Sequence, residues 1–334
     1  MPMTLAESAA IEQKKLRKGV LLAFYQDTLP SPVERVPFED VESLNVPVAM
    51  LAQADAPTLR LINEAPQAWD ARFDQFSETL KVIENTLVHD PVVLMQKNLV
   101  VDPRQQKITA YQRQLQYLVN ELLINGDPSS DPRNPAGLLY RLDNEAKFAG
   151  QTVDCSQAGP VGLNVDASDA NRLLWLDYID DGLYRIDGGN PTFFAMNRQT
   201  HLKFRSALRA LKMLDTTKDQ FDREITSYRG VPFLDTGPTA AASLTGATQV
   251  IADDTETAPS AATNTTSMYA VKTGSDHFMG LQMGGGLDVR HFGEATAMSG
   301  TTLILQDVTR FRWVLGFYTG HPRCIVRVCG LDIS

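Results

Sequence analysis

The stretch from Asp102 to Gly126 constrains the fold of this chain more than any other part of the sequence. Asp102 and Pro103 make a helix start, because aspartate caps the first amides and proline lacks only an amide that has no partner there. Asn125 and Gly126 make a helix stop. Residues 103–124 are therefore predicted to form a helix roughly 33 Å long. Its apolar residues recur at spacings of three and four, the pattern of one buried face: Ile108, Tyr111, Leu115, Leu118 and Leu122.

The other faces of this predicted helix are polar and mostly carry neutral amides. They hold Arg104, Gln105, Gln112, Arg113, Gln114, Gln116 and Asn120. Neutral amides on several faces indicate a helix that is touched by neighbours on several sides. A plain amphipathic core helix is the alternative explanation of the same pattern.

The composition is that of a globular, acidic protein. Of the 334 residues, 43% are hydrophobic and 21% charged, and the length suggests two or three domains. A net charge of −9 argues against a surface dedicated to binding nucleic acid, although not against a protein that encloses it. Three scattered cysteines form no disulfide or metal pattern and are typical of a reducing cytosol. The sequence has no apolar run of about 20 residues and no signal peptide.

The N-terminal residues read as an amphipathic arm on an extended strap. Apolar residues such as Leu5 and Leu16 are interrupted by charges over residues 4–24, and three prolines follow within residues 28–37. A terminal helix on such a strap needs a surface to dock on. We expect that surface to belong either to its own domain or to a neighbouring copy.

Residues 44–88 are predicted to form a long hairpin. Two runs with strand-like alternation, 44–51 and 79–88, flank a segment that is too long for a tight turn and rich in apolar residues. Exposed apolar patches mark contact sites, so we expect an intersubunit surface made by Leu59, Leu61, Ile62, Trp69 and Phe73. Arg60 and Arg72 lie among them, placed to reach carboxylates on the next subunit. The alternative is that residues 67–76 fold back onto the core as a short helix.

The next part of the chain reads as an α+β domain. Ser168 and Asn197 each cap a predicted helix, and a short apolar strand lies between those helices at 192–196. The expected buried stripes are Leu173, Leu176, Ile179 and Leu183 in the first helix, and Leu202, Leu208, Leu211 and Leu214 in the second. A strand pair is predicted around Arg229 and Gly230.

The remainder is predicted to be a polar insertion followed by strands. Residues 237–267 are small and polar, which is typical of a loop or surface insertion. The triple glycine at 284–286 is expected to be a tight turn between two strands. Residues 302–317 and 323–329 are expected to pair as a closing β-hairpin.

The sequence contains no catalytic, cofactor-binding or metal-binding constellation. The five histidines lack metal-ligand spacing, and the triple glycine is not followed by the residues of a phosphate-binding loop. We therefore expect no enzyme activity, no cofactor and no metal.

In this order of elements, the chain resembles the major capsid proteins of tailed bacteriophages with the Hong Kong 97-type fold. Two segments carry the local resemblance: the helix exit at 122–127 with residues 134–138, and the closing run at 316–323 with residues 324–331. The resemblance covers nearly the whole length.

The resemblance implies an α+β capsid fold with four parts. These are an N-terminal arm (1–43), an extended hairpin or E-loop (44–88), a peripheral domain with the long spine helix (89–150 and 300–334), and an axial domain (151–299) with its surface insertion at about 237–267. It also implies pentamers and hexamers that close into an icosahedral shell around double-stranded DNA. Portal, scaffolding and decoration proteins would be the partners, and the virion, assembled in the host cytoplasm, the location.

Two features depart from some members of that family. The arm begins at once rather than after a cleaved scaffolding segment, so any scaffold is expected to be a separate protein. Residues 44–80 contain no lysine, so covalent crosslinking through the hairpin is not expected. An encapsulin-type compartment around an enzyme cargo, which has a similar fold, and a soluble α+β enzyme remain as alternatives.

Overall fold

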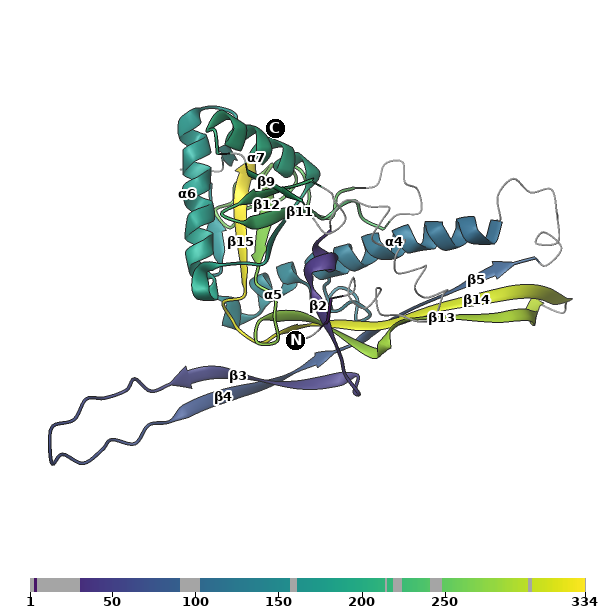
Figure 1. Ribbon diagram of the computed structural model, residues 1–334, viewed down its shortest axis with the longest axis horizontal. Helices are drawn as coiled ribbons and strands as arrows, with labels where there is room; N and C mark the ends of the chain where they lie inside the picture. The colour runs from purple at the N-terminus through teal and green to yellow at the C-terminus, as the bar shows by residue number, and fades with distance from the viewer. Residues whose placement is uncertain are drawn as a thin grey trace.

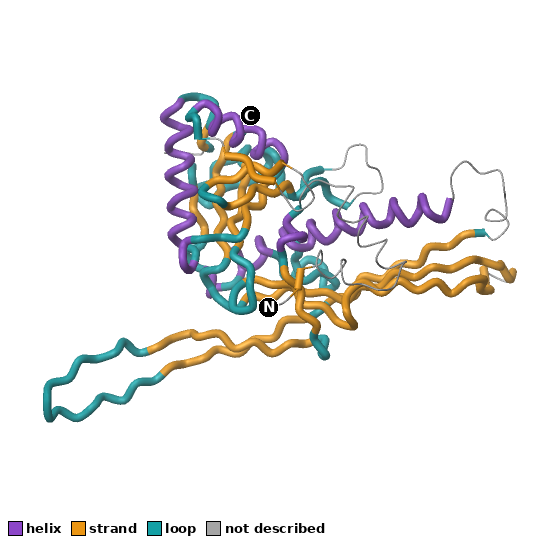
Figure 2. The backbone as a smooth tube through the Cα atoms, viewed as in Figure 1, coloured by secondary structure: helices purple, strands orange, loops and turns teal. Residues whose placement is uncertain are grey.

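A computed structural model describes residues 3–4, 31–90, 103–156, 161–213, 215–218, 224–240, 248–299 and 302–333. Two β-sheets form the body of the molecule, and a two-stranded ribbon projects from it (Figure 1). Figure 2 shows that the longest described helix lies along one sheet, while two further helices pack on the other.

The first sheet has five strands in the order β1-β2-β13-β14-β5. Its strands are β1 (Met3–Thr4), β2 (Pro37–Asp40), β5 (Lys81–His89), β13 (Phe278–Ser299) and β14 (Thr302–Thr319). The long helix α4 (Pro103–Asn125) covers this sheet (Figure 1). Side chains at every second position of β14 are buried in the shared core, as the alternation predicts: Phe311, Trp313, Leu315 and Phe317.

Helix α4 agrees with its prediction from the sequence, whereas its expected cap Asp102 lies outside the described residues. Tyr111 and Leu118 of the predicted stripe are partly buried, and the other three members are fully buried. The amides of Gln112, Gln116 and Asn120 are buried as well. Gln116 Nε2 donates to Ser31 Oγ over 3.2 Å, so α4 does have neighbours on several sides.

The second sheet has eight strands, ordered β6-β15-β12-β8-β11-β10-β9 with β7 paired to β15. Their bounds are Thr152–Asp154 (β6), Leu163–Asn164 (β7), Phe193–Met196 (β8), Asp215–Lys218 (β9), Glu224–Tyr228 (β10), Val231–Asp235 (β11), Thr266–Val271 (β12) and Ile325–Asp332 (β15). Helices α6 (Asp169–Arg185) and α7 (Arg198–Ala210) pack on it (Figure 1). The other face of the sheet contributes Ala195 and Tyr269 to the core that α4 shares.

The predicted helix caps are present, but the predicted stripes need correction. Ser168 accepts from the amide of Asn171, and Asn197 accepts from that of Thr200. Leu173 and Leu202 are half exposed, so both were wrongly placed in the core. Aromatic packing between the helices decides the buried faces instead. Trp175 of α6 meets Phe204 of α7 edge to face, with ring centroids 4.8 Å apart.

Two predicted turns are wrong. Strand β14 does not pair with β15; it lies between β13 and β5, while β15 joins β12, β6 and β7 in the other sheet. The closing β-hairpin therefore does not exist. The triple glycine 284–286 does have positive φ at each residue, but it is a bulge within β13, where the register shifts between Met283 and Asp288.

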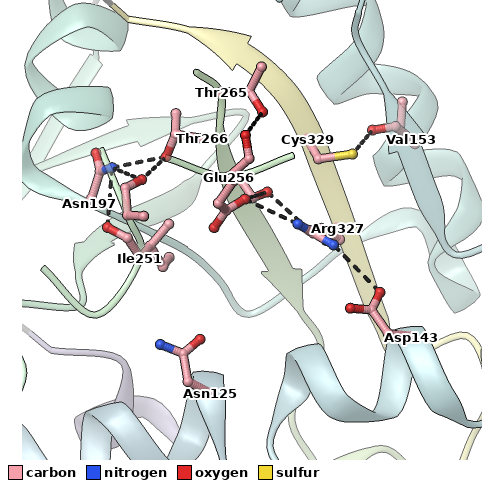
Figure 3. Close-up of polar contacts among 12 residues, drawn as sticks. Asn125, Asp143, Val153, Asn197, Ile251, Glu256, Thr265, Thr266, Arg327 and Cys329 are labelled. Carbon is pink, nitrogen blue, oxygen red and sulfur yellow. Dashed lines mark hydrogen bonds and ion pairs between the residues drawn. The ribbon is translucent and has the colours of Figure 1, made fainter. Parts of the chain in front are cut away.

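The predicted surface insertion 237–267 is built into the body where it is described. Val250 and Ile251 are buried in the core around α4, and Asn125 Nδ2 donates to Val250 O over 2.5 Å. Figure 3 shows Glu256 paired with Arg327 of β15 at 3.1 Å, while Arg327 also reaches Asp143 at 3.5 Å. Val250, Ile251 and Glu256 are therefore built into the body, whereas residues 259–261 and 263–264 of the same segment are exposed.

The predicted hairpin is shorter than expected, and the chain crosses between the two sheets more than once. Strand β3 (Asn45–Ala54) pairs with β4 (Ala71–Thr79) alone, whereas β5 belongs to the first sheet, so the hairpin proper ends near residue 79. The chain passes from the second sheet to the first between β12 and β13, and back between β14 and β15. Two short connections thus link the sheets.

The remaining short helices are η1 (Pro32–Arg35), α5 (Leu138–Asn144), η2 (Ala146–Phe148) and η3 (Asp187–Gly189).

Candidate intersubunit surface

The ribbon of β3 and β4 projects away from the body of the subunit (Figures 1 and 2). Its ladder runs from the pair Asn45 and Thr79 to the pair Ala54 and Ala71, with one bulge near Leu51. A two-stranded ribbon has marginal stability in water by itself, so its root must be held by the body.

A buried ion pair holds this root. Arg141 of α5 is 1% exposed and grips Glu78 of β4 with two hydrogen bonds, of 2.6 and 2.9 Å. The same guanidinium donates to Phe317 O at 2.9 Å and to Thr319 Oγ1 at 3.1 Å, both on β14. Burial lowers the pKa of Arg141, but the charge of Glu78 and the hydrogen bonds to it outweigh burial, so the pKa lies above its ordinary value. The pair fixes where the ribbon leaves the body.

A second cationic contact supports the same root. The Lys147 ammonium lies 3.6 Å from the centre of the Phe76 ring and forms an ion pair with Glu145 at 2.8 Å. The side chains of Val48 and Met50 on the paired strand are buried. The ribbon is therefore packed near the body and free only beyond these residues.

Hydrogen bonds within the loop 55–70 shape its tip. At the neck, Trp69 Nε1 donates to Asp55 O over 2.7 Å, and the Asp55 amide donates to Asp70 O over 3.0 Å. At the far end, the Glu64 amide donates to Leu61 O in a tight turn. Asn63 occupies the left-handed region there with φ of 70°, which asparagine tolerates well.

The apolar side chains of this tip are not covered by any described part of their own subunit. Leu59, Leu61 and Ile62 are exposed by 103%, 78% and 92%, and Trp69 and Phe73 by 59% and 61%. Residues 55–70 form a loop and 71–79 a strand, so the alternative of a short helix folded back over 67–76 is wrong. Most of this apolar surface is available to a partner.

The two arginines among the predicted contact residues have partners within their own ribbon. Arg60 donates to Glu64 O over 2.8 Å, and Arg72 pairs with Asp74 at 3.2 Å in an exposed ion pair. Exposed pairs of this kind contribute only about 0–1 kcal/mol, so both arginines remain available to carboxylates on another chain. The two limbs of the loop diverge around an open hollow of about 780 Å³ that Trp69 and Pro66 help to line.

The structure gathers the seven predicted hairpin residues on one ribbon and its tip. Leu5 and Leu16 fall outside the described residues. The described part of the arm contains β1, η1 and β2, and it places Val33, Val36 and Phe38 in the core around α4. Sequence reasoning missed Glu78 and Arg141, which lie 63 positions apart with no local pattern that joins them. It also missed Phe292, which is 54% exposed on β13 beside Arg310.

The described residues offer little that points to metal or thiol chemistry. In this part of the chain, no group of three or more His, Cys, Asp or Glu residues could hold a metal ion. Burial raises the pKa of the Cys324 thiol to about 12, and that of Cys329 likewise to about 12, which makes poor nucleophiles. None of the described helices is long and apolar enough to cross a membrane.

Solved shell proteins match this chain over nearly its whole length. The encapsulin of the holo-SrpI complex from Synechococcus elongatus superposes with a TM-score of 0.57 at 15% identity, covering 90% of this chain and 86% of that one. The capsid of the native GTA particle gives 0.54 at 14% identity, with 92% and 90% covered. Mycobacterium phage Cain gives 0.53 at 12% identity, with 98% of both chains covered.

No protein-family model matches the sequence, and no curated protein matches it either. The likeness therefore lies in the arrangement of the elements: a ribbon that leaves the body, a long helix along one sheet, and a second sheet with two helices. The chain has the Hong Kong 97-type capsid fold.

Proposed function

We propose that this protein is the major capsid protein of a tailed bacteriophage and builds its icosahedral shell. One observation carries the proposal: a shell-protein fold over the whole chain, with a projecting ribbon whose apolar tip has no cover in its own subunit. An exposed apolar tip of this kind marks a surface for a partner. The role is therefore structural rather than catalytic.

In this proposal the main partner is a second copy of the same chain. Leu59, Leu61, Ile62, Trp69 and Phe73 of one subunit dock on its neighbour, and Arg60 and Arg72 reach carboxylates there. Copies associate as pentamers and hexamers around double-stranded DNA, without sequence-specific contacts. Portal, scaffolding and decoration proteins complete a virion that assembles in the host cytoplasm.

In this proposal each part of the chain has its own role in the shell. The ribbon within 44–88 is the clasp, and the arm 1–43, with Leu5 and Leu16, is a second contact with a neighbouring subunit. Residues 89–150 and 300–334 make the peripheral domain and residues 151–299 the axial domain. The sheets divide the chain differently from these ranges by one strand on each side. Strand β13 falls within 151–299 but belongs to the first sheet, and β15 falls within 300–334 but belongs to the second.

An encapsulin-type compartment is the second candidate, favoured by the match to an encapsulin with a TM-score of 0.57. The two functions place different contents inside similar shells. A phage shell encloses DNA, whereas a compartment encloses a protein cargo and needs no portal.

Electron microscopy of the purified recombinant protein tests the shell itself. We expect closed hollow particles of uniform size, and a protein that stays monomeric at all concentrations, with or without co-expressed phage head proteins, contradicts the proposal. The contents of particles purified from the natural source then decide between the candidates. Nuclease-protected DNA supports the capsid, and a stoichiometric enzyme cargo supports the compartment.

A further inference from the structure

A cluster of charged and imidazole groups lies where the chain crosses between the two sheets. The connections between β12 and β13 and between β14 and β15 run side by side there, since the Gly320 amide donates to His277 O over 2.7 Å and the Lys272 amide to Cys324 O over 2.8 Å. Both connections contact the segment that follows α6. The contacts of this cluster therefore hold the two connecting segments in place.

Asp187, just beyond α6, is the anion of the cluster. Its carboxylate accepts from His277 Nε2 over 3.3 Å and lies 3.9 Å from Lys272 Nζ. The same ammonium donates to Asp187 O over 2.7 Å. The first connection is thereby attached to the end of α6.

Arg323 attaches the second connection to the same helix end. Its guanidinium donates to the carbonyls of Arg185 and Tyr184 over 2.8 and 3.0 Å, where α6 has carbonyls without helical partners and the negative end of its dipole. The Asp187 amide in turn donates to Arg323 O over 2.9 Å. The position of Arg323 therefore decides whether this connection stays closed on α6.

His321 holds Arg323 in that position through a single nitrogen. The Arg323 backbone amide donates to His321 Nδ1 over 3.1 Å. That nitrogen accepts only while the imidazole is neutral with its proton on Nε2; in the imidazolium form both ring nitrogens are donors. Protonation of His321 thus places an Nδ1–H opposite the Arg323 amide N–H, so the hydrogen bond of the turn loses its acceptor.

We propose that His321 is an acid-sensitive latch, which closes the β14–β15 connection on the end of α6 when neutral and releases it when protonated. The release concerns one of the two short connections between the sheets and leaves their shared core intact. It is a property of the single subunit and does not depend on what the assembled shell encloses.

The surrounding charges favour release at acid pH. The His277 ring faces that of His321 with centroids 5.8 Å apart, and Lys272 and Arg323 are fixed cations. Asp187 is the one close anion among the described groups of the cluster, and Asp276, Tyr318 and Tyr184 border the cluster. When His321 is protonated, its imidazolium joins the cations Lys272 and Arg323 around the single carboxylate of Asp187.

The sign of the pH dependence follows from these contacts. Burial lowers the pKa of His321, as do the charges of His277, Arg323 and Lys272, whereas Asp187 opposes them. A lowered folded-state pKa means that the stabilisation is present above the unfolded value of about 6.5 and is lost as the pH falls through the folded value. The first connection stays attached to α6 through Lys272, whose ammonium donates to Asp187 O.

Hydrogen exchange followed by mass spectrometry on the full-length protein tests the latch. Exchange is compared at about pH 7.5 and about pH 5, corrected for the intrinsic effect of pH on exchange. In the wild type we expect peptides that contain residues 186–188 and 320–325 to lose protection roughly three- to tenfold at acid pH, the range expected for one lost hydrogen bond. Peptides from α4 should not change.

Three variants separate the latch from other acid effects. His321→Asn should stay closed at both pH values, because the asparagine side-chain oxygen accepts from an amide two residues on without titrating. His321→Ala should be open at both. The control His291→Asn, which removes another histidine–carboxylate contact, should respond like the wild type.

The proposal is overturned if the wild type shows no loss at these peptides, or if His321→Asn loses protection as the wild type does. Equal loss in every peptide of the chain overturns it too, because that pattern reports global unfolding.

Discussion

Trp69 and Phe73 offer the sharpest test of the projecting ribbon as an intersubunit clasp. The perturbation is the double substitution Trp69→Ala with Phe73→Ala. Both side chains belong to the ribbon beyond its buried root and are 59% and 61% exposed. The subunit itself should therefore depend little on them, while a contact with a neighbour should depend on them strongly.

The magnitude follows from the exposed fractions. Full burial of a large apolar side chain contributes about 1.5–3 kcal/mol, so burying the exposed three-fifths of each supplies about 1–2 kcal/mol, or about 2–4 kcal/mol for the pair. A loss of that size weakens each contact by about 30-fold or more. Within the subunit, surface substitutions usually change the free energy of unfolding by less than about 0.5 kcal/mol.

Two assays on the same preparations separate these effects. Chemical denaturation followed by circular dichroism reports the stability of the subunit, and light scattering with sedimentation reports the protein concentration at which shells form. We expect unchanged denaturation and an assembly threshold raised by at least about tenfold.

A matched variant isolates apolar burial from loop closure. Trp69→Phe with Phe73→Leu keeps most of the apolar area but loses the hydrogen bond from Trp69 Nε1 to Asp55 O. It should assemble close to the wild-type threshold. The clasp is refuted if the alanine pair assembles normally, or if its subunit unfolds and so reveals that these side chains support their own chain.

Three further predictions follow from buried and terminal contacts. Glu78→Gln leaves the Arg141 guanidinium buried without its main anion and should cost about 3 kcal/mol of unfolding free energy by urea titration, whereas Asp131→Asn in an exposed ion pair should cost far less. Deleting residues 1–27 should leave a folded, soluble subunit that assembles poorly; normal shells in the electron microscope would exclude a role for the arm. Cys324, with a thiol pKa of about 12, should resist iodoacetamide at about pH 8 until the protein is unfolded, as peptide mass spectrometry can check.

Sequence patterns predicted the features that depend on interactions between residues close together in the chain. The span of α4, the caps at Ser168 and Asn197, and the turn at Arg229 and Gly230 follow from side chains that satisfy neighbouring amides or tolerate positive φ. The period of two in β14 likewise predicted which of its residues are buried. The capsid fold itself was predicted from a resemblance to a known family, in the order of the elements and in two local segments.

The core faces of α6 and α7 were predicted less well. Leu173 lies three positions before Leu176 and so fits a stripe on spacing alone. Leu202 lies six positions before Leu208 and does not; the buried face of α7 is made by Phe204, Ala207 and Leu208 instead. Packing of Trp175 against Phe204 turned both helices so that these two leucines face outward. Polar residues of 248–267 were misplaced for a similar reason, since their buried partners are distant in sequence.

By itself, the sequence determined the helices, their caps, the alternation of the strands and the apolar content of residues 59–73. Only the tertiary structure decided which strands pair, that β14 and β15 lie in different sheets, and that the ribbon projects instead of folding back. Strand pairing and the Glu78–Arg141 anchor join residues far apart along the chain, and their energy depends on geometry that no short window of sequence contains. Helix and turn signals act within a few residues, and for that reason they can be read from the sequence alone.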